Sequence, residues 1–225
     1  MVMIQPAVAD VCGHKARFEE QRHDKRCPHT LTLRMRARIF KHRCVRVVHR
    51  VHHKCRRAAR ATSFQFGGHR FNGNGEMTGT HWINDAGYFL GPICITNTHG
   101  VGAAHTGATR WMIDTYSDYF QNHHAWAMPV VAETYDGVLN DITAMHVKPD
   151  HALAALNAAT TGPVAEGSTG GGNGMICYEF KGGTGTSSRL VEIDGQGYTV
   201  AALVQANHGI RPWLNILGRP VGQLM

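Results

Sequence analysis

Hydrophobic and polar residues follow two different patterns along this chain, and the change falls near residue 70. In residues 25–70, single apolar residues stand between closely spaced cations, so neither a helical nor a strand period can be followed. Such a pattern offers no continuous face to bury, and we expect it to form no core of its own. From residue 71 onward, short apolar runs alternate with glycine-containing turns.

The apolar runs of residues 71–225 predict short strands and two helices. Bounded apolar runs at residues 92–96 and 129–133 favour buried strands. Apolar residues at three- and four-residue steps predict a helix over residues 101–120, and Pro149 opens a second helix over residues 151–159. Three further strand-like runs follow a glycine-rich loop: residues 175–180, 187–194 and 198–206. This mixture predicts an α+β fold.

Charge divides the chain at the same place as hydropathy. Residues 1–70 hold 17 of the 23 Lys and Arg residues but only four acidic residues, whereas residues 71–225 hold six basic and 12 acidic residues. The net charge of +7 therefore describes only the first third of the chain. We predict two regions: a basic, non-native or disordered segment at residues 1–70, and a folded domain at residues 71–225.

The basic segment admits three functional interpretations, each incompletely supported. Its charge suits nucleic-acid binding, but no recognised module accompanies it. Cys44, His49, His52, His53 and Cys55 could bind zinc, yet their spacing matches no known zinc motif. A membrane-surface helix would need an apolar face that is absent. We favour out-of-frame translation of a GC-rich gene, which translation of the coding DNA in three frames would test.

Several common functions find no signature in the sequence. The chain contains no secretion signal and no run of 18 apolar residues, so we expect a cytoplasmic protein without a membrane partner. The hydrolase motifs GxSxG, HExxH and SxxK are absent. The glycine-rich stretch at residues 161–174 lacks the ending of a phosphate loop. We expect no cofactor and no metal.

Four separated motifs do carry information: residues 71–80 (FNGNGEMTGT), 95–99 (ITNTH), 131–137 (VAETYDG) and 204–209 (VQANHG). Together, and in this order, they resemble the DmpA/BapA family of self-processing serine aminopeptidases. The resemblance implies L-aminopeptidase, D-amidase/esterase or β-aminopeptidase activity, with a precursor that cuts itself before a serine nucleophile. It spans about residues 72–222. It implies part of an αββα sandwich resembling N-terminal-nucleophile hydrolases, with the amino-terminal strands and the β-chain missing.

The resemblance assigns roles to three residues. Tyr135 matches the tyrosine beside the nucleophile, and Asn207 matches the oxyanion-hole donor, for which an amide supplies a fixed dipole that does not titrate. Glu133 matches the carboxylate that receives the substrate's ammonium group through a charge-assisted hydrogen bond. Without the resemblance, the three would be interpreted as a half-buried tyrosine, a turn asparagine and a surface glutamate. We expect them to converge on one pocket.

The nucleophile itself is expected beyond Met225. Ser168 follows a glycine, as self-cleavage sites of the family do, but it precedes Asn207, so we interpret it as a loop residue. The chain alone should be inert. A turn at residues 194–197 joins the strands at 187–194 and 198–206, but further strands that should pack against 198–206 are missing on both sides, which should leave a sheet edge and an apolar face open. The expected partners are a peptide, amide or ester substrate, the β-chain, and further copies in a homo-oligomer. A non-catalytic binding remnant that uses Glu133 and a nucleic-acid-binding protein acting through residues 1–70 remain as alternatives.

Overall fold

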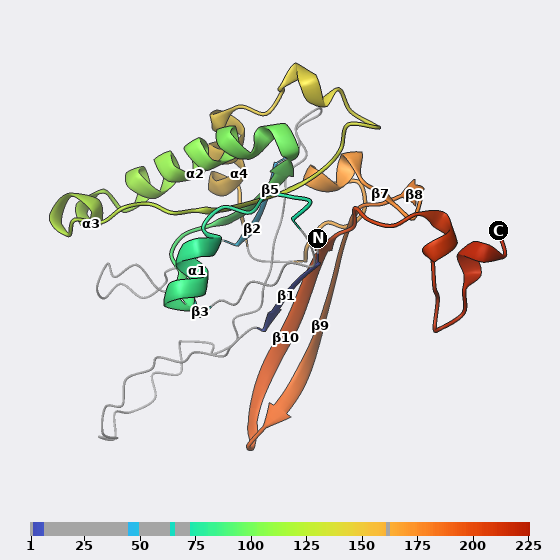
Figure 1. The fold of residues 1–225 in the computed structure, drawn as a ribbon. Coiled ribbons are helices and arrows are strands. Elements are labelled where there is room, and N and C mark those ends of the chain that lie inside the picture. Colours follow the sequence, from blue (N-terminus) through green and yellow to red (C-terminus); the bar gives the residue numbers. More distant parts are fainter. Residues whose placement is uncertain (1, 7–44, 50–63, 66–72, 161–162) are drawn as a thin grey trace.

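The computed structural model describes residues 2–6, 45–49, 64–65, 73–160 and 163–225 (Figure 1). Strands and helices mix throughout this part of the chain, so the α+β class is confirmed. Most of residues 1–70 lies outside the described residues, and the predicted division of the chain at residue 70 stays a prediction. No helix in the described ranges is long and apolar enough to cross a membrane.

A three-stranded sheet forms the centre of the fold, with strand order β2 (Val45–His49), β5 (Ile93–Asn97) and β6 (Val130–Thr134). Strands β5 and β6 lie within one residue of their predicted positions. They run parallel, with Ile93 opposite Val130, whereas β2 pairs antiparallel with β5. Because parallel neighbours need a crossover, the chain between β5 and β6 leaves the sheet and forms helices.

Helices α2 (Val101–Thr115) and α4 (Pro149–Asn157) pack together over one face of this sheet (Figure 1). Helix α2 ends five residues before the predicted boundary because Tyr116 leaves the helical conformation, at φ −122° and ψ 35°. A short helix α3 (Ser117–Asn122) follows it. The cluster between helices and sheet consists of buried side chains: Cys94, Ala104, Ala108, Trp111, Met112, Val131, Val147, Ala152 and Leu156.

The opposite face of the sheet packs against helix α1 (Thr80–Ala86), strand β4 (Tyr88–Phe89) and the long hairpin of β9 (Thr184–Ile193) and β10 (Gln196–Gln205). Leu203 of β10 joins the buried side chains of this second cluster: Ile83, Phe89, Ile93, Ile95, Val130 and Ala132. A helical layer, the central sheet and the second sheet thus lie in succession. This order agrees with part of an αββα sandwich.

The hairpin turn between β9 and β10 has positive φ at both central residues, 52° at Asp194 and 74° at Gly195. An Asp-Gly pair suits this geometry because it matches the twist of the flanking strands. Strand β1 (Val2–Pro6) pairs with the other edge of β10. The predicted connection between the strands at 187–194 and 198–206 is confirmed, whereas the expected open sheet edge beside 198–206 is wrong: β10 lies between β1 and β9.

Three short strands or helices and one predicted strand also differ from the sequence-based predictions. Strands β2 and β3 (Phe64–Gln65) lie where the residue pattern predicted no strand. Strand β2 pairs with β5, and β3 pairs with β4. The backbone hydrogen bonds of these pairs form whether or not the side chains follow a strand period. The run at 175–180 forms not one strand but two, β7 (Ile176–Cys177) and β8 (Phe180–Lys181). Helix α1 was not predicted from the sequence.

Candidate active site

The candidate residues gather where β6 ends. Its first three residues, Val130, Val131 and Ala132, are fully buried, and the chain then turns polar at Glu133. Tyr135 follows the last strand residue directly. Asn207 lies two residues past the end of β10, the strand that packs beneath this sheet. The topology therefore brings strand ends that are 72 residues apart in sequence to one place.

A hydrogen bond joins Tyr135 to Asn207. The Tyr135 backbone N–H donates to Asn207 Oδ1 at 3.1 Å, and Asn207 Nδ2 donates to the carbonyl oxygen of Ile176 at 3.4 Å. A backbone N–H requires an acceptor, so this bond fixes which end of the amide is oxygen. The amide NH2 group has two hydrogens, so it can donate a second hydrogen bond in addition to the Ile176 contact. That is a property an oxyanion donor needs.

The Tyr135 ring is half exposed, with 53% of the residue accessible to solvent. It folds back over Gly137: a Cβ atom at that position would lie only 2.5 Å from the Tyr135 hydroxyl. The phenol therefore lies against the Gly137 backbone, in the space that the Cβ atom of any other residue would occupy. This contact fixes where the hydroxyl lies relative to the end of β6.

The Glu133 carboxylate accepts hydrogen bonds on both of its oxygens. Thr98 Oγ1 donates to Oε2 at 2.6 Å, and the Glu76 backbone N–H donates to Oε1 at 3.2 Å. Glu133 is half-buried, and both donors belong to segments with exposed residues. Residues from three of the four sequence motifs thus meet at one carboxylate.

A buried polar network that sequence reasoning missed supports the strand ends from below. Asp136, which is 2% exposed, accepts hydrogen bonds on Oδ2 from Asn140 Nδ2 at 2.8 Å and from Asn97 Nδ2 at 3.3 Å. Gln205 Nε2 donates to Thr134 Oγ1 in the same region. The polar residues directly after two buried apolar strands were the sequence signal that could have indicated this network.

The last five residues of the glycine-rich stretch are packed against neighbouring side chains and do not form an open loop. Residues 170–174 form a short 3₁₀ helix in which four glycines are buried. A Cβ at Gly171 would lie 2.4 Å from Gln205 Oε1, and one at Gly174 would lie 2.5 Å from Asp136 Cβ. Glycine is therefore required for the backbone to approach these two polar side chains.

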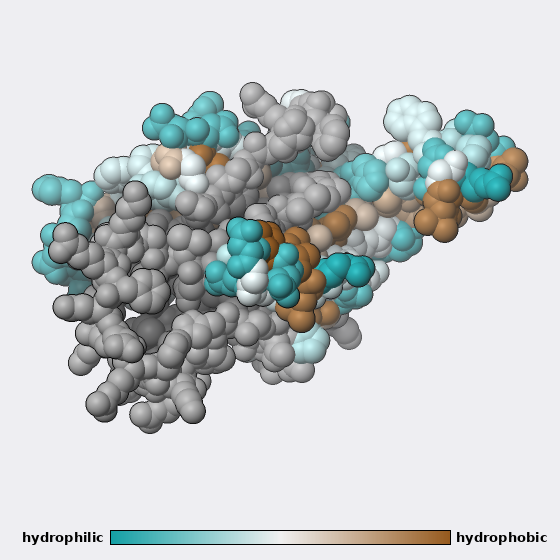
Figure 2. Space-filling view, turned by 90° about the horizontal axis from the view of Figure 1, so that it is seen from below, coloured by the Kyte–Doolittle hydropathy of each residue, from teal (hydrophilic) through white to brown (hydrophobic). Residues whose placement is uncertain are grey.

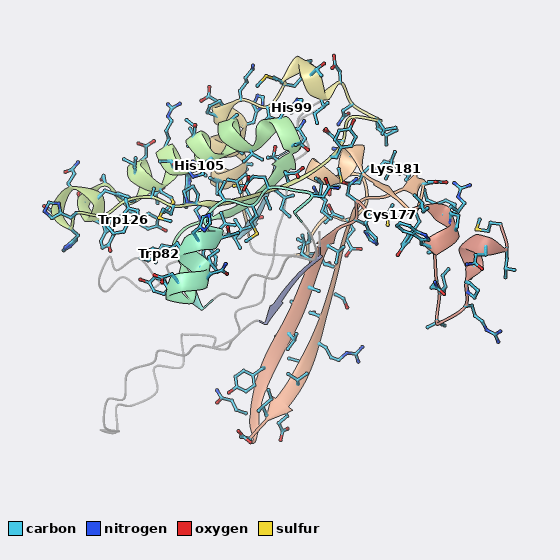
Figure 3. The ribbon with its side chains drawn as sticks, viewed as in Figure 1. Trp82, His99, His105, Trp126, Cys177 and Lys181 are labelled. Atoms are coloured by element: carbon cyan, nitrogen blue, oxygen red, sulfur yellow. The ribbon has the colours of Figure 1, made fainter. Side chains whose placement is uncertain are left out.

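The β7–β8 hairpin borders the site on the Asn207 side. Cys177 Sγ lies 3.8 Å from both ring nitrogens of His208, and the His208 carbonyl accepts the Tyr178 N–H at 2.8 Å. Figure 3 shows Cys177 and Lys181 between the core and the carboxyl-terminal arm, residues 211–225. Lys181 Nζ donates to the carbonyls of Gly172 and Gly182, and burial lowers its pKa from the ordinary lysine value.

Ser168, the alternative nucleophile, lies in a different local structure. The preceding Gly167 exchanges two backbone hydrogen bonds with Thr184, at 2.7 and 2.9 Å. This pairing ties the Gly167–Ser168 segment to the start of β9. Across the described residues, no group of three His, Cys, Asp or Glu side chains could hold a metal ion.

Comparison with known proteins gives a consistent result. The model of peptidase family S58 matches residues 47–225, so the match begins 24 residues before the predicted boundary at residue 71. A β-peptidyl aminopeptidase BapA of Sphingosinicella microcystinivorans is 57% identical over 152 residues, which are 68% of this chain and 37% of that protein. A second BapA, of Sphingosinicella xenopeptidilytica, is 48% identical over the same shares of both chains. The chain thus spans less than two-fifths of the length of these relatives.

A solved structure is similar to this chain in both sequence and fold. The L-aminopeptidase D-Ala-esterase/amidase of Ochrobactrum anthropi, described as a variant of the Ntn hydrolase fold, is 62% identical, with a TM-score of 0.67. The similarity covers 70% of this chain and 44% of that one. The predicted fold and the resemblance stated from the motifs are both confirmed. By the extent of the family match, this chain belongs to peptidase family S58.

Proposed function

We infer that this chain is part of an aminopeptidase that releases amino-terminal residues from peptides, amides or esters through an acyl-enzyme. The observation that carries the proposal is the hydrogen bond between Tyr135 N–H and Asn207 Oδ1. It joins two distant sequence motifs beside Glu133, at the end of β6. Membership of family S58 and relatives named as aminopeptidases support the same activity.

Each of the three residues suits one task in that reaction. Glu133 would bind the free ammonium group of the substrate, which distinguishes an aminopeptidase from an endopeptidase. Asn207 Nδ2 would donate to the oxyanion of the tetrahedral intermediate, a preorganised dipole of the kind that contributes most to acyl transfer. The Tyr135 phenol would donate a hydrogen bond to the reacting oxygen or nitrogen.

The nucleophile would be a serine in a carboxyl-terminal segment, freed by self-cleavage to become the first residue of a β-chain. The serine hydroxyl attacks the substrate carbonyl, and the amine or alcohol leaves with a proton. Water then hydrolyses the ester bond of the acyl-enzyme and frees the serine. By this proposal residues 1–225 are inert until that segment is present. Association of the completed αβ units into a homo-oligomer in the cytoplasm belongs to the same proposal.

The test uses what we term the completed enzyme: residues 1–225 followed by the carboxyl-terminal remainder of the Sphingosinicella microcystinivorans relative. We expect it to cleave itself and to release nitroaniline from alanyl p-nitroanilide. Asn207→Ala should lower kcat by about 10²- to 10³-fold, the usual loss for one oxyanion donor. Absence of hydrolysis by a self-cleaved enzyme, or an unchanged kcat in Asn207→Ala, would contradict the proposal.

A further inference from the structure

The Glu133 carboxylate is held from two sides by the protein itself. Its neighbour across the sheet is Thr96 of β5, and the two residues lie in parallel register. Strand β5 ends at Asn97, and the chain turns into a 3₁₀ helix at Thr98. This turn brings the Thr98 hydroxyl back to Glu133 Oε2, at 2.6 Å, instead of letting the chain continue along the strand.

The second contact comes from the opposite edge of β6. Residues 76–78 run beside that strand, and the Glu133 N–H donates to the Glu76 carbonyl at 3.2 Å while the Glu76 N–H donates to Glu133 Oε1. Thr78 reinforces the pairing, because its N–H donates to the Val131 carbonyl at 2.9 Å. A Cβ at Gly75 would lie 3.1 Å from Oε1, so this edge approaches the carboxylate closely.

An ionised carboxylate offers about four lone-pair positions, of which these two donors use two. The remaining positions can accept N–H donors from a ligand. A glutamate side chain otherwise has several accessible rotamers, and ordering it on binding would cost affinity. Donors that order it beforehand remove that cost.

We propose that Thr98 is a positioning residue, which orients the Glu133 carboxylate to receive the primary ammonium group of the substrate. The inference rests on the proposed function of Glu133. Thr98 itself touches no reacting atom: it acts through Glu133, with the Glu76 N–H as the opposing donor. Replacing its hydroxyl should therefore weaken recognition of the ammonium group while leaving the chemistry of the carbonyl unchanged.

The first experiment needs no catalysis and uses residues 1–225. Amide hydrogen exchange at Glu76, measured by NMR, reports whether Glu133 Oε1 stays in place. Thr98→Val should speed this exchange several-fold, and Thr98→Ser should leave it near the wild-type rate because the hydroxyl remains. Unchanged exchange at Glu76 in Thr98→Val would overturn the proposal.

Thr186 provides a matched control, since its hydroxyl donates to Glu166 Oε1 at 2.6 Å and its own N–H donates to the same oxygen at 2.8 Å. Thr186→Val removes a threonine–glutamate bond of the same kind on β9. It should leave the exchange of Glu76 unchanged. A similar acceleration at Glu76 in both variants would indicate general loosening and would count against a role for Thr98 in positioning.

The second experiment uses the completed enzyme with alanyl and propionyl p-nitroanilides, which differ only in the ammonium group. For Thr98→Val we expect kcat/KM to fall about tenfold on the alanyl substrate, the scale of one hydrogen bond to a charged group, chiefly through KM. The propionyl substrate should be affected less than about twofold. Thr98→Ser should retain the wild-type discrimination between the alanyl and propionyl substrates, because its hydroxyl remains.

Glu133→Gln separates failure of this inference from failure of the proposed function. If Glu133→Gln abolishes the preference for the alanyl substrate and Thr98→Val keeps it, Thr98 does not position the carboxylate. If Glu133→Gln itself leaves the preference intact, the ammonium site lies elsewhere, and the proposed role of Glu133 fails first. Equal losses on both substrates in Thr98→Val would likewise overturn the inference.

Discussion

Tyr135 and Gly137 show how one missing side chain can set the position of another. The ring atoms of Tyr135 occupy the space that a Cβ at Gly137 would need, with distances of 2.5 Å to the hydroxyl and 2.6 Å to Cζ. Since the ring is half exposed, it can move aside without opening a cavity in the core. Glycine at this position therefore matters for where the phenol lies more than for stability.

Gly137→Ala should accordingly change the free energy of unfolding by less than about 1 kcal/mol, as for surface substitutions, while it displaces the Tyr135 ring. In the completed enzyme we expect kcat to fall, with KM for alanyl p-nitroanilide nearly unchanged. Steady-state kinetics and urea unfolding together measure both effects. Gly73→Ala is the control, because a Cβ there has no neighbour within 4 Å. Full activity in Gly137→Ala would argue against a catalytic role for the phenol.

Sequence reasoning found residues at this scale only where a motif indicated them. Glu133, Tyr135 and Asn207 look like ordinary strand-end residues, and only the resemblance of their motifs to a family singled them out. Asp136 is adjacent to Tyr135 in the same motif, yet its burial and its bonds to Asn97 and Asn140 arise from chain crossings that no local pattern encodes.

At the scale of elements, the approach of α2 to α4 depends on a glycine in the middle of a helix. A Cβ at Gly107 would lie 2.2 Å from the Pro149 carbonyl oxygen and 2.9 Å from Ala152 Cβ. The backbone of one helix thus rests directly on the first turn of the other. Nearby, Trp111 Nε1 donates to Asn157 Oδ1 at 2.9 Å, which ties the other end of α4 to the same helix.

We expect Gly107→Ala to destabilise the fold by about 1–3 kcal/mol, because the added methyl group meets backbone that cannot move aside easily. Gly102→Ala, in the same helix with no atom within 4 Å of its Cβ position, should change stability by less than about 1 kcal/mol. Urea unfolding of the two variants measures the difference. Equal stabilities would show that the backbones of α2 and α4 do not approach each other this closely.

Elements were predictable where hydrophobic periodicity alone decides them. The apolar runs of β5 and β6 and the stripe of α2 indicated these elements because each buries a continuous face. The pattern failed for β2, whose strand conformation comes from pairing with β5, and for residues 170–174, whose glycines fit against Gln205 and Asp136. Both depend on partners that are distant in sequence.

At the scale of the whole molecule, the described residues expose several large apolar side chains, and two groups of them lie on the β9–β10 hairpin and on the carboxyl-terminal arm. Leu190 and Ile193 on the hairpin are 79% and 56% exposed, and Trp213 and Leu217 on the carboxyl-terminal arm are 66% and 100% exposed. Figure 2 views the hairpin end-on and shows apolar surface there and along the arm. Exposed apolar groups gathered in this way are typical of surfaces that bind further protein.

If the proposed function is right, purified residues 1–225 should release no product from alanyl p-nitroanilide. No serine of this chain follows Asn207, so the covalent route through an acyl-enzyme has no nucleophile at the position that the motifs imply. Ser168, which precedes Asn207, lies beside the Gly167–Thr184 pairing instead. Turnover is measured by nitroaniline absorbance, and the completed enzyme at equal concentration serves as the positive control. If residues 1–225 alone show turnover that Ser168→Ala abolishes and Asn207→Ala leaves intact, the reaction takes place at the Gly167–Ser168 loop and the assignment of Asn207 is wrong.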